Sequence, residues 1–172
     1  RTEVSEARWN LAELFPEAGA GTELTLWIQV GNGGDDQNPS TGYVDNFRVG
    51  PVAKVASLGQ AHPQCFSAPA PVSGRRWLAE VDASAVNGAL FTVVVGHERA
   101  AANVLTTSGS LLDLASSQAF FSLLPASGGI DVHEVKIPSD PALIGKKLYA
   151  QGVVIGPTGR HYCNALELLL GF

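Results

Sequence analysis

Short strand-like segments separated by turn-forming residues recur through the C-terminal two-thirds of the chain, and this spacing restricts the possible folds most. Val86-Asn87-Gly88 and Ser127-Gly128-Gly129 are typical of the separating turns. The predicted strands are Trp77–Ala83, Leu90–Gly96, Ala119–Leu123, Ile130–Ile137, Lys146–Ile155 and Tyr162–Leu170. Strands at this spacing are typical of sandwiches, so we predict an all-β chain with an antiparallel β-sandwich of the immunoglobulin-like or jelly-roll type.

The N-terminal part also has a strand pattern. Glu23–Val30 alternates apolar and polar residues, the polar segment Gly31–Gly42 is a predicted hairpin loop, and Tyr43–Val49 is a second strand. Val4–Phe15 is compatible with a strand and turn or with a short helix, and we favour strand then turn. A partial β-sandwich of about three strands is therefore expected before the main one.

The changes in composition divide the chain into three parts. We predict that residues 1–50 form the C-terminal strands of a jelly-roll-like sandwich, that residues 51–64 are a linker, and that residues 65–172 form the main β-sandwich domain. The domain boundary is placed where a segment rich in proline and serine follows Cys65.

Two cysteines, Cys65 and Cys163, are the only thiols in the chain. Their wide separation fits one disulfide that closes a domain better than it fits a metal or redox motif. The alternative is a pair of unpaired thiols in the core, because free cysteine is often buried. A disulfide would indicate an oxidising compartment, and we expect a secreted, extracellular or cell-surface protein.

Charge and hydropathy exclude several classes of protein. The net charge is −5, and no stretch gathers lysine and arginine into a site for nucleic acid. The longest apolar runs, such as Leu166–Leu170, are too short to span a membrane. The chain starts at Arg1 and lacks methionine, so we expect that a preceding segment has been removed.

No catalytic motif is present. The four histidines, His62, His97, His133 and His161, have no zinc-type spacing, and the glycine-rich segment near Gly33 precedes no predicted helix. No serine, histidine and aspartate set is marked by its local context. We therefore predict a protein that is not an enzyme and has no catalytic residues or organic cofactor.

The last part of the chain carries a recognisable pattern. Ile137, Pro138, Pro141, Leu143 and Gly145 are followed by Tyr149-Ala150-Gln151 and then by Asn164-Ala165-Leu166. This pattern resembles a β-sandwich found at the ends of large secreted proteins of planctomycete-type bacteria, in which a smaller residue is usual at the position of Cys163. The resemblance implies secretion and a sandwich fold, and it implies no chemistry.

The first fifty residues resemble the last strands of a jelly roll of the galactose-binding or laminin-G kind. The matching residues are Trp9-Asn10-Leu11, Gly21–Ile28 and Tyr43–Val49. Such a jelly roll needs more strands than these residues supply, because few strands alone leave a face and an edge unsatisfied. We expect the remaining strands to come from a removed segment or from a neighbouring subunit.

One candidate site is a calcium site around Asp45. This carboxylate shares a strand face with apolar residues, and the loop before it offers Asp35, Asp36 and Asn38 as oxygen donors. The resembling jelly rolls have a carboxylate near this strand that ligates structural calcium. The alternative is that Asp45 caps backbone amides and the acidic loop is solvated.

A second candidate site consists of aromatic side chains. Trp9, Trp27, Trp77 and Tyr43 could stack on sugar rings if they are exposed, or form core or interface if they are covered. Interface burial is favoured.

Two functions remain open. The first is a non-catalytic structural or assembly subunit of a surface or fibre, which associates with itself or with other secreted proteins through strand edges and apolar interfaces. The second is a glycan-binding module at the C-terminal end of a larger secreted protein.

Overall fold

The computed structural model describes residues 11–14, 16, 50–58, 62–101 and 109–172. By its internal contacts the chain divides into two compact units, Arg1–Arg48 and Val49–Phe172. In the first unit the described part is one helical turn, α1 (Leu11–Leu14). The strand-then-turn prediction was wrong for these four residues, whose leucine, alanine and glutamate are all good helix formers.

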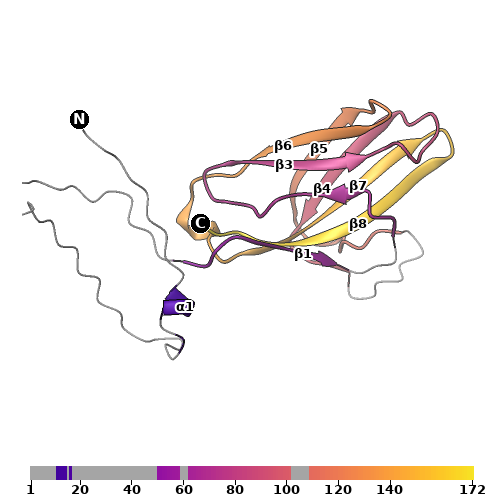
Figure 1. The fold of residues 1–172 in the computed structure, drawn as a ribbon. Helices are drawn as coiled ribbons and strands as arrows, with labels where there is room; N and C mark the ends of the chain where they lie inside the picture. The colour runs from indigo at the N-terminus through magenta and orange to yellow at the C-terminus, as the bar shows by residue number, and fades with distance from the viewer. Residues whose placement is uncertain (1–10, 15, 17–49, 59–61, 102–108) are drawn as a thin grey trace, which may run out of the picture. The chain divides into compact units, whose positions relative to one another are not determined.

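The second unit is an all-β sandwich of two antiparallel sheets (Figure 1). One sheet has five strands in the order β1-β8-β7-β4-β5, and the other has three in the order β2-β3-β6. The strands are β1 (Lys54–Leu58), β2 (Phe66–Ser67), β3 (Arg76–Asp82), β4 (Phe91–His97), β5 (Gln118–Pro125), β6 (Ile130–Lys136), β7 (Lys147–Gly156) and β8 (Gly159–Leu169). A short 3-10 helix, η1 (Pro141–Leu143), joins β6 to β7.

All six strands predicted for the main sandwich are present as β3 to β8, so the all-β prediction is confirmed. In β3, buried Trp77, Ala79 and Val81 alternate with more exposed residues, as the period of a half-buried strand requires. The predicted turns are also present: Gly88 and Gly128 both have a positive φ, a conformation in which glycine carries no steric penalty.

Two strands were not predicted, and β1 lies inside the segment expected to be a linker. It pairs antiparallel with β8, from Lys54 opposite Leu169 to Leu58 opposite Ala165. Four of its five residues are exposed, so its sequence lacks the alternation that would mark a strand. β2 has only two residues, which is too short for any pattern to appear.

The main core lies between the two sheets, where Trp77 contributes the largest side chain. Its indole ring meets Phe120 edge to face with centroids 5.5 Å apart, and its Nε1 donates to the carbonyl oxygen of Pro69 at 2.7 Å. Gly96 lies beneath Phe120, and a side chain on Gly96 would overlap that ring. The buried core residues include Phe66, Trp77, Val81, Val94, Ile137, Val154, Cys163, Leu166 and Leu168.

A second, smaller core covers part of the outer face of the five-stranded sheet. Leu111 and Leu112 are each 2% exposed and pack with Ala165 of β8, beside Tyr149 of β7. β7 and β8 are therefore buried on both faces along part of their length, which explains why consecutive residues such as Val153 and Val154 of β7 and Ala165 and Leu166 of β8 are apolar.

Candidate functional site

Most of the residues predicted to form a ligand site lie outside the described residues. This applies to Asp35, Asp36, Asn38 and Asp45 of the calcium hypothesis, and to Trp9, Trp27 and Tyr43 of the aromatic hypothesis. Both hypotheses remain predictions. Within the described part of the chain, no group of three or more histidine, cysteine, aspartate or glutamate side chains could hold a metal ion.

Trp77 is the one aromatic candidate that the structure describes. It is 2% exposed and packs in the main core, so it offers no stacking surface to a sugar. Of the two alternatives for the aromatic residues, stacking surface or burial, the structure shows burial for this residue.

Cys65 and Cys163 form a disulfide, as predicted, with their Cα atoms 5.2 Å apart. Cys163 is a fully buried residue of β8 in the five-stranded sheet. Cys65 immediately precedes β2, and its carbonyl oxygen accepts a hydrogen bond from the backbone of Asp82 at the end of β3. The disulfide thus joins the two sheets covalently.

Asn164 reinforces the connection made by the disulfide. Its Oδ1 accepts from the backbone N–H of Phe66 at 3.0 Å, and its Nδ2 donates to the carbonyl oxygen of Phe66 at 2.9 Å. The side chain therefore takes the place of a backbone partner for β2.

Gln151 has a similar role on β7. Its Oε1 accepts from the backbone of Leu111 at 2.9 Å, and its Nε2 donates to the carbonyl oxygen of Cys163 at 2.9 Å. It attaches the loop of the smaller core to the sheet. Gln151 and Asn164 both belong to the recognisable C-terminal pattern, and in this chain their amides stabilise backbone rather than bind a ligand.

A buried polar network, formed by Thr92, Ser122, Asp131 and His133, joins the sheets at their β5–β6 side. Asp131 and His133 point inward from β6 and meet Thr92 of β4 and Ser122 of β5. The sequence contained a signal for it, because Asp131 and His133 share the alternation of Val135 on one face of β6. Ser122 and Thr92 come from distant segments and could not be assigned to the network from sequence.

The hydrogen bonds of the network fix the direction of each donor. The hydroxyl of Thr92 donates to Asp131 Oδ2 at 3.0 Å, so Thr92 Oγ1 accepts from His133 Nε2 at 3.2 Å. A neutral imidazole protonated on Nε2 then accepts at Nδ1 from the Ser122 hydroxyl, 2.9 Å away. The other oxygen of Asp131 accepts from the backbone of Ser127 at 3.0 Å.

The environment shifts the pKa values of both titratable groups in the network. Burial lowers the pKa of His133, and the nearby Asp131 carboxylate only partly opposes this. Burial by itself would raise the pKa of Asp131, but hydrogen bonds from Ser127 and Thr92 and the proximity of His133 bring it below the usual value. The folded protein therefore holds His133 neutral and Asp131 ionised at neutral pH.

Mild acid is expected to destabilise the sandwich through His133. Its pKa is lower in the folded protein than in the unfolded chain, so its contribution to stability is complete above about pH 6.5 and is lost as the pH falls toward the folded-state pKa. One proton gives a slope of at most about 1.4 kcal/mol per pH unit. Denaturant unfolding at a series of pH values measures this slope.

The control for this pH dependence is His133→Gln, which keeps hydrogen-bonding groups but cannot titrate. It should be less stable than the wild type at pH 7.5 and should lose most of the slope below pH 6.5. An equal slope in the variant and the wild type would contradict the assignment to His133.

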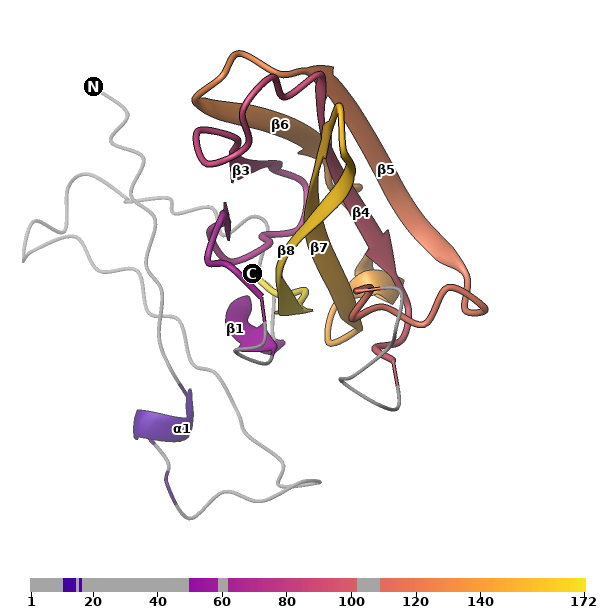
Figure 2. The same cartoon turned by 90° about the vertical axis from the view of Figure 1, so that its right-hand side faces the viewer.

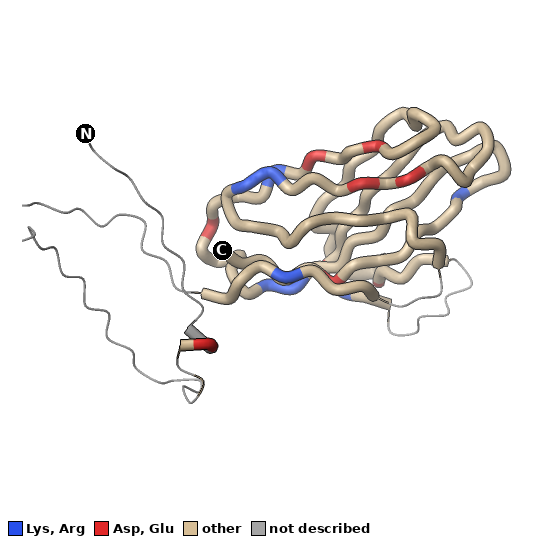
Figure 3. Tube along the Cα trace, in the orientation of Figure 1, with Lys and Arg blue, Asp and Glu red and all other residues tan. Residues whose placement is uncertain are grey.

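The four edge strands of the sandwich differ in their charge. β6 carries Asp131, Glu134 and Lys136, β1 is short and begins with Lys54, and β2 has two residues. β5 has eight residues and no charge. Figure 3 shows acidic and basic positions along β3 and β6. By contrast, the segment that contains β5 has no charged residue between Asp113 and Asp131. Charges, prolines and short length normally protect sheet edges from other chains, and β5 has only a terminal proline.

Within the described part of the chain, the outer edge of β5 has no strand paired with it. Ala126 donates to the carbonyl oxygen of Leu90, just beyond the β4–β5 ladder, and this sets which β5 residues face β4. By alternation, Ser122 and Leu124 bond toward β4, while the backbone N–H and C=O groups of Phe121 and Leu123 point outward. No partner for these outward groups is found among the described residues. Figure 2 shows β5 at the margin of its sheet.

Apolar side chains extend from this edge over the outer face of the sheet. Phe121 is 56% exposed and Leu123 is 45% exposed, and they lie opposite Val95 and Val93 of β4. Phe91, also on this face, is 39% exposed. A row of exposed apolar residues beside an unpaired edge is typical of a site for another β-strand.

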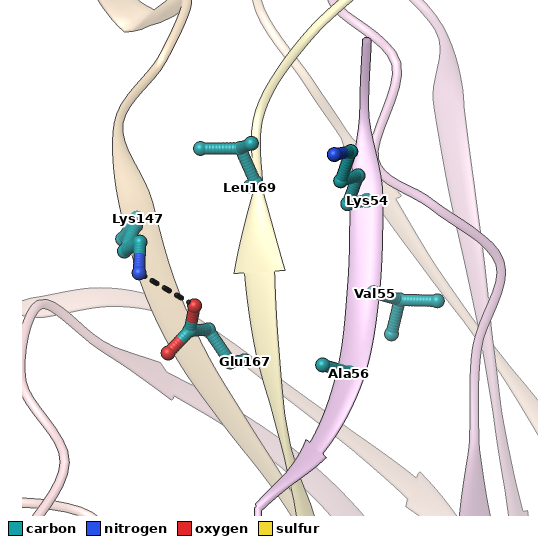
Figure 4. Close-up of a pocket in the computed structure, with 6 residues that line it drawn as sticks. All are labelled: Lys54, Val55, Ala56, Lys147, Glu167 and Leu169. Atoms are coloured by element: carbon teal, nitrogen blue, oxygen red, sulfur yellow. Dashed lines mark ion pairs between the residues drawn. The ribbon is translucent and has the colours of Figure 1, made fainter. Parts of the chain in front are cut away.

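The outer face near β1 carries charged side chains, unlike the uncharged edge of β5. Lys54, Val55, Ala56, Lys147, Glu167 and Leu169 line an open hollow of about 280 Å³ (Figure 4). Lys147 Nζ pairs with Glu167 Oε1 at 2.8 Å, and both side chains are partly exposed. An exposed pair of this kind adds little stability, and the hollow offers no enclosed site.

Comparison with known proteins identifies no relative: no protein-family model matches the chain, and no curated protein matches its sequence. Among the described helices, none is long and apolar enough to cross a membrane.

Proposed function

We propose that this protein is a non-catalytic, extracellular structural subunit that assembles by adding a β-strand from another chain to the free edge of β5. The observation that carries the proposal is an uncharged edge strand of eight residues with exposed Phe121 and Leu123. An added strand would satisfy the outward backbone groups and cover these side chains, and it would thus gain both hydrogen bonds and apolar burial.

The disulfide between Cys65 and Cys163 supports an extracellular role. A disulfide that joins the two sheets is stable in an oxidising environment and is rare in reducing ones. The C-terminal pattern ending in Asn164-Ala165-Leu166 resembles that of large secreted bacterial proteins, which agrees with secretion to the cell surface. We therefore assign the protein to the outside of the cell.

The buried network is structural in this proposal, although Ser122 donates to a histidine as an activated serine would. His133 is completely buried, and Ser122 lines neither the hollow beside β1 nor a second hollow lined by Gln64, Phe66 and Ile130. The network instead holds β5 against β6.

A pair of lysines on the β5 edge is expected to abolish assembly. In the variant Phe121→Lys/Leu123→Lys, two like charges enter the added-strand interface, and association should weaken by at least about a hundredfold. Both positions are exposed, so the melting temperature should change little. Light scattering of material isolated from its source measures the assembled mass.

The matched control is Leu78→Lys/Val132→Lys on the outer face of the three-stranded sheet. These leucine and valine side chains are 45% and 49% exposed, close to the values for the β5 pair. The control should assemble as the wild type does. If both double variants assemble normally, the β5 edge is not the assembly site.

A further inference from the structure

We infer that the strand added to β5 is the β5 strand of a second copy of this chain, paired antiparallel with Ser122 facing Ser122 across a two-fold axis. This inference rests on the proposed function and specifies its partner. The two five-stranded sheets would then become one continuous sheet, and the interface would be isologous.

The absence of charge at this edge favours pairing of two copies. The whole chain has a net charge of −5, so two copies generally repel each other. The segment between Asp113 and Asp131 has no charged residue, so two β5 strands can approach without placing like charges opposite each other. β6 lacks this property, because it carries Asp131 on its inner face and Glu134 and Lys136 on its outer face, so its self-pairing would bring charged side chains into the interface.

The side chains of two β5 strands complement each other in the register centred on Ser122. Residues that lie directly opposite in antiparallel strands share a face, so a two-fold axis at Ser122 places Phe121 opposite Leu123 of the other copy, twice. On the inner face it places Phe120 opposite Leu124. A register centred on Phe121 would instead put the small side chain of Ala119 opposite Leu123 and leave the leucine less well covered.

The outward backbone groups of β5 fit the same register. Phe121 and Leu123 are the residues whose N–H and C=O groups point away from β4, as the Ala126–Leu90 hydrogen bond indicates. In the Ser122-centred register these two residues of one copy exchange both hydrogen bonds with Leu123 and Phe121 of the other. Pro125, which has no N–H to donate, falls at the end of the paired segment, where its cost is smallest.

Disulfide trapping with mixed variants tests this register. Phe121→Cys and Leu123→Cys proteins are purified separately, mixed and oxidised gently. Hydrogen-bonded antiparallel partners have Cα atoms about 5.5 Å apart, which suits a disulfide. The mixture should form a covalent heterodimer at least about tenfold faster than either variant forms a homodimer. A homodimer formed faster by Phe121→Cys alone would overturn the register.

Leu78→Cys mixed with Val132→Cys is the matched control, and it should give no crosslink above background. Because a cysteine variant could misfold, hydrogen exchange of the wild type supplies a second test. The amides of Phe121 and Leu123 should exchange more slowly as protein concentration rises. Exchange rates that do not depend on concentration would overturn the inference.

The partner and the proposed function can fail separately. Light scattering of the purified chain alone should show dimers that dissociate on dilution. A purified chain that stays monomeric, together with an isolated assembly that still depends on the β5 edge, would overturn the second copy as partner and leave the proposed function standing.

Discussion

Reduction of the Cys65–Cys163 disulfide is expected to lower the free energy of unfolding by about 4 kcal/mol and the melting temperature by roughly 10 °C or more. The two cysteines are 98 residues apart in sequence, so the bond closes a long loop and greatly restricts the unfolded chain. The bond also joins the sheets beside the Asn164 hydrogen bonds. Thermal unfolding with and without reductant measures the effect.

The double variant Cys65→Ala/Cys163→Ala separates the crosslink from the packing of the sulfur atoms. Cys163 is completely buried in the core, so its replacement also leaves a small cavity. The variant should therefore be somewhat less stable than the reduced wild type, and reductant should not change it further. An unchanged melting temperature of the wild type under reductant would contradict a stabilising role.

The second large effect is expected for Thr92→Val, which should cost about 3 kcal/mol of stability. Valine has nearly the shape of threonine but lacks the hydroxyl that donates to Asp131 and accepts from His133. The substitution leaves a buried carboxylate and a buried imidazole without one partner each, and an unsatisfied buried group is costly. Denaturant unfolding at pH 7.5 measures the difference.

Thr92→Ser is the matched control, because it retains the hydroxyl and removes one buried methyl group. It should cost only about 1 kcal/mol. Equal losses for the valine and serine variants would show that packing, not the polar network, determines stability at this position.

The sequence predicted the sandwich well because its strands are long and their patterns are strong. β3 alternates buried and exposed residues along its length, and β7 and β8 are long strands separated by the turn signal Gly156–Gly159. β1 was missed because exposed residues dominate it, and only its pairing with β8 makes it a strand. Non-local pairing of this kind leaves no local pattern.

The buried network and the free edge of β5 were less predictable, because both depend on which strands lie side by side in the fold. The buried network brings together Thr92, Ser122 and the pair Asp131 and His133 from three strands, and no single segment shows that they meet. The free edge of β5 depends on the strand order, since the same apolar segment in the middle of a sheet would be an ordinary core strand. The apolar, uncharged character of β5 was visible in the sequence, and its place at the edge was not.

The most direct test of assembly through a strand edge is negative-stain imaging with mass determination of the protein as isolated. Assembly through the β5 edge predicts dimers or larger oligomers, which the lysine pair at Phe121 and Leu123 reduces to single copies. Uniform monomers at high protein concentration would contradict it and would instead favour a glycan-binding module, for which glycan arrays with substitutions at Trp27 and Asp45 would be the next experiment.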